Sequence, residues 1–213
     1  MLKLYIGNKN YSSWSMRPWL VLKKAQLSFE ETLIQLYVPG VKSRLNQLSP
    51  AGTVPVLQVG EQMIPDSLAI ADWAANCVPN LWPKNEEDKQ LAQNFCRQMQ
   101  EDFGEFRKHA PMNLRRRTTT KMPKLALEAT DKMQALWLEY LARHDGPFLF
   151  GQWSIADAFA TPYATRFISY NIERNARADT YMSELMADDD FLEWEFEALK
   201  ETWTIEPVDK VGL

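Results

Sequence analysis

The sequence predicts an α/β segment at the N-terminus followed by an all-helical segment. Three observations predict this division. Strand and helix patterns alternate within the first 80 residues, a polar stretch with two prolines follows at residues 79–88, and apolar residues beyond it recur at helical spacing. The 213 residues suffice for two modest domains. We therefore expect one domain over residues 1–80 and an all-helical domain over residues 86–213.

The chain opens with a β-α-β pattern. Residues 2–6 alternate in hydrophobicity, which predicts a strand. A helix is expected to begin within residues 14–17 and to end near Gln26. Pro18 should lie in its first turn, because a proline deeper in a helix interrupts the hydrogen-bond ladder. Residues 29–37 predict a second strand, and a β-α-β unit usually forms a parallel pair.

The rest of the first 80 residues completes the order β-α-β-α-β-β-α. Residues 41–48 predict a short helix. Residues 54–59 and 62–64 flank a Gly-Glu turn and predict a β-hairpin. Asp66 then begins another helix, which is expected to extend at least to Ala74.

The second part of the chain shows helical patterns almost throughout. Apolar residues recur at helical spacing over residues 91–106 and 125–141, a third helix is expected over residues 154–170, and two more within residues 175–201. Residues 148–150 are the longest strand candidate. The second part is therefore expected to be all-helical.

Composition narrows the functional classes. A formal net charge of -4 and a pI near 5.3 argue against a nucleic-acid partner. No apolar run approaches the ~20 residues that cross a bilayer, and no secretion signal is visible, so we expect a cytoplasmic protein without a membrane partner. The two cysteines, Cys77 and Cys96, form no C-x-x-C pair, and neither a disulfide nor a bound metal is expected.

A serine-rich turn between the first strand and the first helix is the main candidate for chemistry. It reads Ser12-Ser13-Trp14-Ser15. Its serines can cap the helix, or one hydroxyl can donate to a thiolate that the helix dipole also favours. Lowering the pKa of a bound small-molecule thiol from about 8.5 by ~2 units corresponds to about 2.7 kcal/mol. One hydrogen bond to a charged group, worth roughly 1.5–3 kcal/mol, supplies much of that free energy.

The order of elements, with Val54-Pro55 opening the third strand, resembles the thioredoxin-like domain of glutathione transferases. Residues 11–20 are similar to the S-x-x-S and S-S-C-S-W-R motifs of serine-type transferases, including the zeta class. The resemblance implies that Ser12, or its neighbour Ser13, is catalytic. Trp14 stands where the zeta class has cysteine, which counts against the zeta isomerisation. Because serine cannot exchange disulfides, thioredoxin or glutaredoxin chemistry is disfavoured.

The resemblance also implies a glutathione-binding site. It implies a cis peptide at Val54-Pro55, which presents the Val54 backbone to the cysteinyl part of glutathione. Asp66-Ser67-Leu68-Ala69-Ile70 is similar to the family's E-S-x-A-I, whose serine and helix N-terminus suit the γ-glutamyl carboxylate and whose acid suits the ammonium. Lys42 lies where the family reaches the glycine carboxylate. The implied site comprises Lys42, Thr53, Val54, Pro55, Asp66 and Ser67.

Two features of the second part bear on the resemblance. Ser154-Ile155-Ala156-Asp157 is a capping-box signature at the start of a buried helix, similar to that of the transferase C-terminal domain. The run Arg115-Arg116-Arg117 is interpreted as a solvated face or a helix end; alternatively, one of these arginines lines the acceptor pocket together with Met112.

The resemblance implies a glutathione S-transferase, a transferase of alkyl or aryl groups. Glutathione would be the co-substrate and an unspecified electrophile or peroxide the acceptor, as in detoxification, with the protein acting as a homodimer. A non-catalytic scaffold of the same fold and a glutathione-dependent isomerase of the zeta type stay open as alternatives. A thiol oxidoreductase is disfavoured because no cysteine lies within residues 12–15.

Overall fold

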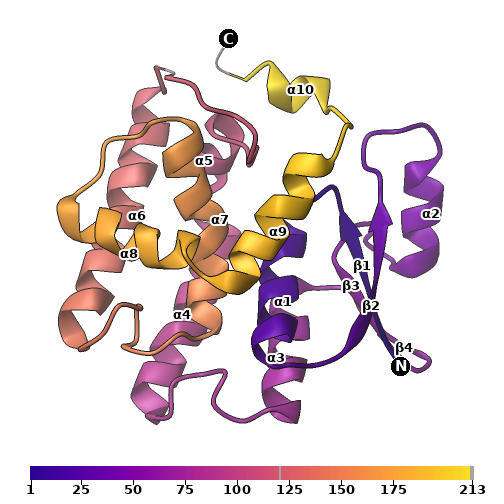
Figure 1. Cartoon of the computed structure of the whole chain (residues 1–213), viewed down its shortest axis with the longest axis horizontal. Helices are drawn as coiled ribbons and strands as arrows, with labels where there is room; N and C mark the ends of the chain where they lie inside the picture. Colours follow the sequence, from indigo (N-terminus) through magenta and orange to yellow (C-terminus); the bar gives the residue numbers. More distant parts are fainter. Residues whose placement is uncertain (120, 212–213) are drawn as a thin grey trace.

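The computed structural model describes residues 1–119 and 121–211 of the chain. Its architecture is a thioredoxin-like α/β part followed by a helical part (Figure 1). In Figure 1 the four strands lie to one side, with α2 beyond them. Helices α1 and α3 lie between the strands and the helices of the second part. The fold class predicted from the sequence is therefore confirmed, whereas the domain boundaries stay predictions.

The sheet has the strand order β2-β1-β3-β4. Strand β1 pairs parallel with β2 and antiparallel with β3, and β3 pairs antiparallel with β4, as the β-α-β and hairpin predictions require. The strands are β1 (Leu2–Gly7), β2 (Phe29–Ile34), β3 (Val56–Val59) and β4 (Gln62–Ile64).

Two of the strands are shorter than the sequence suggested. Strand β2 ends at Ile34, and Tyr37, the last residue expected in it, has a left-handed backbone with a φ of 59° that does not fit a strand. Strand β3 begins at Val56 because Pro55 has no N–H to donate to a neighbouring strand.

The α/β part contains α1 (Ser13–Lys24), α2 (Val41–Leu48) and α3 (Ser67–Cys77). The predicted position of Pro18 is wrong. Because Ser12 caps α1 and the helix begins at Ser13, Pro18 lies in the second turn. The hydrogen bond it cannot donate would have gone to Trp14. Its loss is offset because α1 packs against both α3 and α7, so that nearly the whole helix is buried.

The second part of the chain contains the remaining helices. The apolar run over residues 91–106 forms two helices, because the chain leaves helical geometry at Asp102 and Phe103. Residues 148–150 take part in isolated bridges rather than in a strand. The short α10 was not predicted. The helices are α4 (Glu86–Glu101), α5 (Gly104–His109), α6 (Lys124–Arg143), α7 (Ile155–Ser169), α8 (Ala176–Met186), α9 (Asp189–Lys200) and α10 (Glu206–Asp209).

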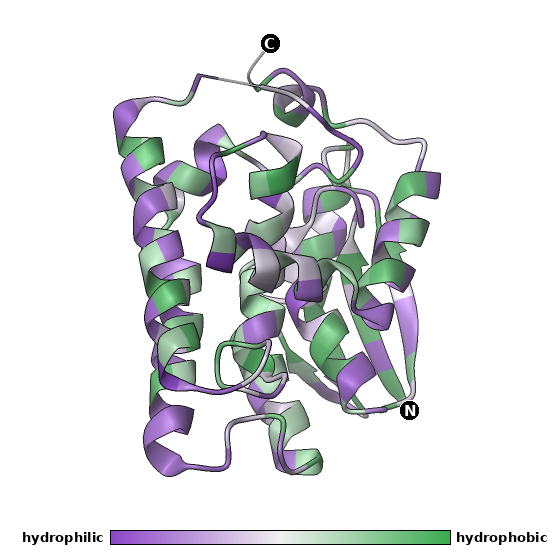
Figure 2. Cartoon of the chain, turned by 60° about the vertical axis from the view of Figure 1, so that its left-hand side comes forward, coloured by the Kyte–Doolittle hydropathy of each residue, from purple (hydrophilic) through white to green (hydrophobic). Residues whose placement is uncertain are grey.

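Helix α7 forms the centre of the hydrophobic core. All of its residues except Ile168 are buried, and it packs against α1, α4 and α8. The predicted capping box is confirmed at its start, between Ser154 and Asp157. In Figure 2, hydrophobic and hydrophilic residues alternate along the outer helices, as expected for helices that bury one face. The core therefore joins the two parts of the chain through α1 and α7.

Over the residues described, no helix combines the length and the apolar character needed to cross a membrane. Cys96 is buried and Cys77 is exposed, and both are free thiols. The described ranges also hold no group of three or more histidine, cysteine, aspartate or glutamate side chains arranged to bind a metal.

Candidate functional site

Ser12 begins α1 and caps it. Its hydroxyl donates to Ser15 Oγ over 2.8 Å and accepts a weaker bond from the Ser15 backbone N–H at 3.4 Å. Ser15 Oγ in turn accepts from the Gly7 N–H at 3.0 Å, which ties the start of the helix to the end of β1. The capping interpretation is therefore confirmed for Ser12, and the proton of its hydroxyl is already engaged.

Ser13 is the first helical residue and differs from Ser12 in its partners. Its Oγ accepts from Arg166 Nη2 at 3.0 Å. Its hydroxyl donates to no residue that the structure describes, so its proton is free for a ligand. The two side chains are nearly buried, with 8% of Ser12 and 5% of Ser13 exposed.

Beside the start of α1 lies a cavity of about 270 Å³. Two backbone regions meet there, the loop that leads into β3 and the N-terminus of α3. The Val54-Pro55 peptide is cis, as the resemblance implied. Five of the six residues implied for glutathione binding share this cavity, whereas Lys42, Ser12 and Ser13 do not line it. Its lining residues are Trp14, Thr53, Val54, Pro55, Pro65, Asp66 and Ser67.

The N-terminus of α3 forms the polar end of the cavity. Asp66 Oδ1 accepts from the backbone N–H groups of Leu68 and Ala69, both at 2.9 Å, so the expected helix cap is present. Gln100 of α4 completes this end, since its Nε2 donates to Asp66 Oδ2 at 3.2 Å and to Ser67 Oγ at 3.1 Å. No sequence motif pointed to Gln100, because a glutamine within a helical pattern is indistinguishable from a surface residue.

Lys42 lies on α2, outside the cavity. It is exposed, and its Nζ donates to the backbone carbonyls of Ala51 and Gly52 at 3.2 and 3.1 Å. It thus holds the loop that precedes Thr53, and it would reach a ligand only by leaving these carbonyls.

Three arginines lie around Tyr163 and are here called the arginine cluster: Arg17 of α1, Arg107 of α5 and Arg166 of α7. The Arg17 guanidinium lies 4.5 Å from the Trp14 ring centroid. Arg17 and Arg166 are buried, and Arg107 is partly exposed. Burial lowers the pKa of Arg17 and lowers that of Arg166 to about 10, with repulsion from the other arginines adding to the effect.

The run Arg115-Arg116-Arg117 does not form a solvated face, so that expectation is wrong for its first two members. Arg115 donates to the backbone carbonyls of Glu201 and Trp203, and Arg116 to that of Asp209. Segment 201–209 leaves these carbonyls outside any long helix, and the arginines satisfy them. The run therefore anchors the C-terminal segment.

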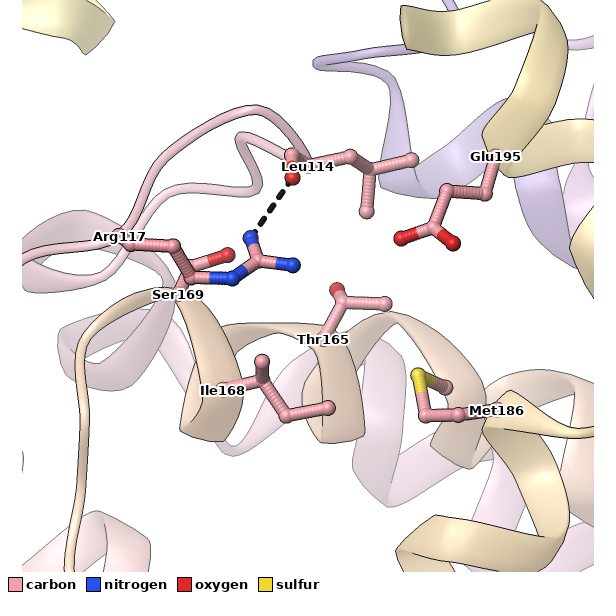
Figure 3. A pocket seen from close by; sticks show the side chains of 7 residues that line it. All are labelled: Leu114, Arg117, Thr165, Ile168, Ser169, Met186 and Glu195. Carbon is pink, nitrogen blue, oxygen red and sulfur yellow. Dashed lines mark hydrogen bonds between the residues drawn. The ribbon is translucent and has the colours of Figure 1, made fainter.

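Arg117 is exposed and donates to the Leu114 carbonyl at 2.8 Å (Figure 3). The pocket drawn there, between this loop and α7, measures about 20 Å³. That volume admits about one water molecule. It is therefore too small for a substrate, and Met112, which is buried, does not line it.

Known proteins are similar to the chain in its N-terminal part and in its fold. Residues 11–77 match the family model described as glutathione S-transferase, N-terminal domain. No curated protein sequence matches the chain. The chain is similar in structure to a glutathione transferase homologue from Burkholderia gl BGR1 with bound glutathione, with a TM-score of 0.75 and 21% identity over 94% of this chain and 99% of that one.

Two further solved structures show the same similarity. Glutathione transferase Omega 2S from Trametes versicolor gives a TM-score of 0.71 at 19% identity, covering 98% of both chains. A glutathione transferase from Methylococcus capsulatus str. Bath gives 0.70 at 20% identity, covering 93% of this chain and 100% of that one. The fold is that of the glutathione transferases. The match to the family model covers residues 11–77, the N-terminal part of the chain.

Proposed function

We propose that the protein is a glutathione transferase that binds glutathione in the cavity between Trp14 and α3 and activates its thiol. The observation that carries this proposal is the convergence of Thr53, Val54, Asp66 and Ser67 on one cavity beside the start of α1. These residues come from two separate motifs of the family resemblance.

The cavity offers complementary groups to each end of the tripeptide. The Ser67 hydroxyl and the N-terminus of α3 suit the γ-glutamyl carboxylate. Asp66 Oδ2 and the Gln100 side-chain carbonyl suit the ammonium group. The Val54 backbone suits the cysteinyl peptide, and that pairing would direct the sulfur toward the first turn of α1. Lys42 would meet the glycine carboxylate after releasing the Ala51 and Gly52 carbonyls.

At the first turn of α1 the thiol loses its proton to solvent, and the helix dipole favours the thiolate that remains. The sulfur electron pair then forms a bond to the electrophilic carbon, and the leaving group departs with its bonding pair. With a peroxide, the thiolate attacks one oxygen, breaks the O–O bond and expels an alkoxide, which leaves a glutathione sulfenic acid. The thiol of a second glutathione then attacks the sulfur of the sulfenic acid, which forms the disulfide and releases water. We assign Ser13 as the hydroxyl that donates to the thiolate, because the Ser12 proton is already bonded to Ser15.

The test compares Ser13→Ala and Ser12→Ala with wild type, using 1-chloro-2,4-dinitrobenzene as a neutral acceptor and calorimetry for glutathione binding. Loss of a hydrogen bond to a charged group, worth roughly 1.5–3 kcal/mol, predicts that Ser13→Ala lowers kcat/KM about 10–100-fold at pH 6.5. Ser12→Ala should lower kcat/KM less than Ser13→Ala does, because Ser12 caps α1. Ser43→Ala, on the exposed surface of α2, is the matched control.

Two results would count against the proposal. Unchanged conjugation in both single variants would remove the serine role, and absence of glutathione binding by the wild type would favour a scaffold. The homodimer and the cytoplasmic location stay predictions. The mass of the protein in solution tests the homodimer.

A further inference from the structure

The arginine cluster places positive charge in the interior without an acidic partner. No carboxylate of the described residues lies within ion-pair distance of Arg17, Arg107 or Arg166. Arg17 Nε, Arg17 Nη1 and Arg166 Nε are buried and make no hydrogen bond to the described part of the chain. Taking a charge out of water costs several kcal/mol unless a partner compensates it.

The partners that the cluster does have are neutral. The Met99 carbonyl, in the last turn of α4, accepts from Arg17 Nη2 at 3.3 Å and from Arg107 Nη1 at 3.0 Å. Arg107 also donates to the Tyr163 hydroxyl at 2.8 Å, and the Arg166 guanidinium lies 5.1 Å from the Tyr163 ring centroid. A helix C-terminus and an aromatic ring stabilise cations only in part.

The titratable groups that face the cluster, apart from its own arginines, are two tyrosines and one cysteine. They are Tyr163 of α7, Tyr170 just after α7, and Cys96 of α4. Burial raises the pKa of Tyr170 to about 12 and that of the Cys96 thiol well above its usual value. Asp157, the buried acid of α7, is engaged by donors at the opposite end of the helix. The cluster therefore has neutral partners only in part and no carboxylate partner among the described residues.

The cluster also contacts a residue that lines the candidate site. Arg17 stacks on Trp14, which lines the cavity. Arg166 Nη2, which is buried, donates to Ser13 Oγ at 3.0 Å. A hydroxyl that accepts from a guanidinium is polarised and becomes a stronger donor through its own proton. One chain of bonds thus leads from a buried cation to the hydroxyl assigned to the sulfur.

From these contacts we propose that Arg166, acting through Ser13, is a positioning residue that stabilises the glutathione thiolate with the positive charge of the arginine cluster. This inference rests on the proposed glutathione transferase function. The thiolate supplies the anion that the cluster lacks, although the two do not touch. Binding of glutathione thereby turns a buried charge that is unfavourable in the free protein into one that favours ionisation of the thiol.

The experiment measures the ionisation of glutathione bound to the full-length protein, from thiolate absorbance near 240 nm as a function of pH. Arg166→Met removes the charge and keeps much of the volume. An opposite charge within ~4–6 Å shifts a pKa by about 1–3 units, so its removal through a relay should raise the pH of half-ionisation by about one unit. At pH 6.5, kcat/KM with 1-chloro-2,4-dinitrobenzene should fall about tenfold and should recover near pH 9.

Three further variants test whether the charge of Arg166 acts on the thiolate through Ser13. Arg166→Lys keeps a cation and should restore part of the ionisation. In a Ser13→Ala background, Arg166→Met should have a much smaller effect than in wild type, because the relay is already broken. Arg97→Met removes an exposed arginine of α4 whose side chain donates to Asn94, and it should leave the titration unchanged.

The outcomes separate this inference from the proposed function. If Arg166→Met binds glutathione and conjugates it with an unshifted titration, the inference is overturned and the transferase function stands. If the wild type binds no glutathione, the function itself fails. Should Arg166→Met not fold, the Arg166→Lys titration and the Ser13→Ala titration decide: equal, unshifted ionisation in both would overturn the inference.

Discussion

The two ends of α7 each carry a buried charge, and the two charges differ in their hydrogen-bond partners. Asp157 lies in the first turn and Arg166 in the last. Both are almost inaccessible to solvent, at 0% and 2% exposure. The macrodipole favours an anion at the first turn and a cation at the last, so each sign suits its position. The ends differ in what else surrounds the charge.

Asp157 is surrounded by donors. Its Oδ1 accepts from the Leu149 N–H at 3.2 Å and the Tyr181 hydroxyl at 2.9 Å, and its Oδ2 from the Ser154 N–H at 2.8 Å and the Ser154 hydroxyl at 3.1 Å. Arg166 has the Ser13 oxygen and one carbonyl of its own helix, with Nε left over. A buried charge whose partners are complete serves the fold, whereas one whose partners are missing points to a ligand.

The largest effect is expected where the buried charge is satisfied. Asp157→Asn should lower the free energy of unfolding by about 3 kcal/mol at pH 7, because the amide NH₂ would face donors where the carboxylate accepted four bonds. Urea unfolding followed by tryptophan fluorescence measures this change. Asp179→Asn is the matched control, since Asp179 is an exposed acid in the first turn of α8.

The same substitution has a pH signature. Burial raises the pKa of Asp157 to about 6, although its hydrogen bonds oppose the rise. A folded-state pKa above the unfolded value of 3.8 means that the native state binds more protons between these two values, so this group's contribution to stability grows as pH falls through 6. The deficit of Asp157→Asn relative to wild type should grow toward pH 4, by up to about 3 kcal/mol. A deficit that shrinks toward low pH would contradict the assignment.

By contrast, removing an unsatisfied charge of the arginine cluster should lower the free energy of unfolding little. Arg17→Met should leave the free energy of unfolding unchanged or raise it by about 1 kcal/mol, because a buried unpaired cation is replaced by an apolar side chain of similar length. The Met99 carbonyl keeps Arg107 and Tyr163 as donors, so no acceptor is orphaned. Urea unfolding beside Asp157→Asn provides the contrast. A loss of 3 kcal/mol or more would make Arg17 a structural residue like Asp157.

Some features of the fold could be predicted from the sequence and others could not. The element order followed from local patterns, because alternation and helical spacing report which face of a segment is buried. The capping box at Ser154 could be predicted because both of its residues lie within one turn. The position of Pro18 was not, since tertiary packing of α1 overrides the local cost of a proline. Helix α10 is too short to show a period.

For the site, the sequence identified what lies within motifs and missed what crosses between elements. Asp66 and Val54 belong to contiguous segments that bear the family resemblance. Arg166 and Ser13 are far apart in the chain and meet only because α7 packs on α1. The run at Arg115 was misread because the acceptors of its hydrogen bonds, carbonyls of residues 201–209, have no signature in the amino-acid sequence.

The smallest effect is predicted for a substitution of Gln100. This residue follows Met99, whose backbone carbonyl accepts hydrogen bonds from the arginine cluster. Gln100 itself faces the other side, toward Asp66 and Ser67. Gln100→Ala should weaken glutathione binding about 3–10-fold, corresponding to about 1 kcal/mol for one lost polar contact, while the titration of the bound thiol stays that of wild type. Calorimetry on Gln100→Ala and on Gln93→Ala, a partly exposed residue of the same helix, measures the change. Equal affinity in both variants would remove Gln100 from the site. A shifted titration would instead mean that the α3 end of the cavity and the arginine cluster act on the sulfur together.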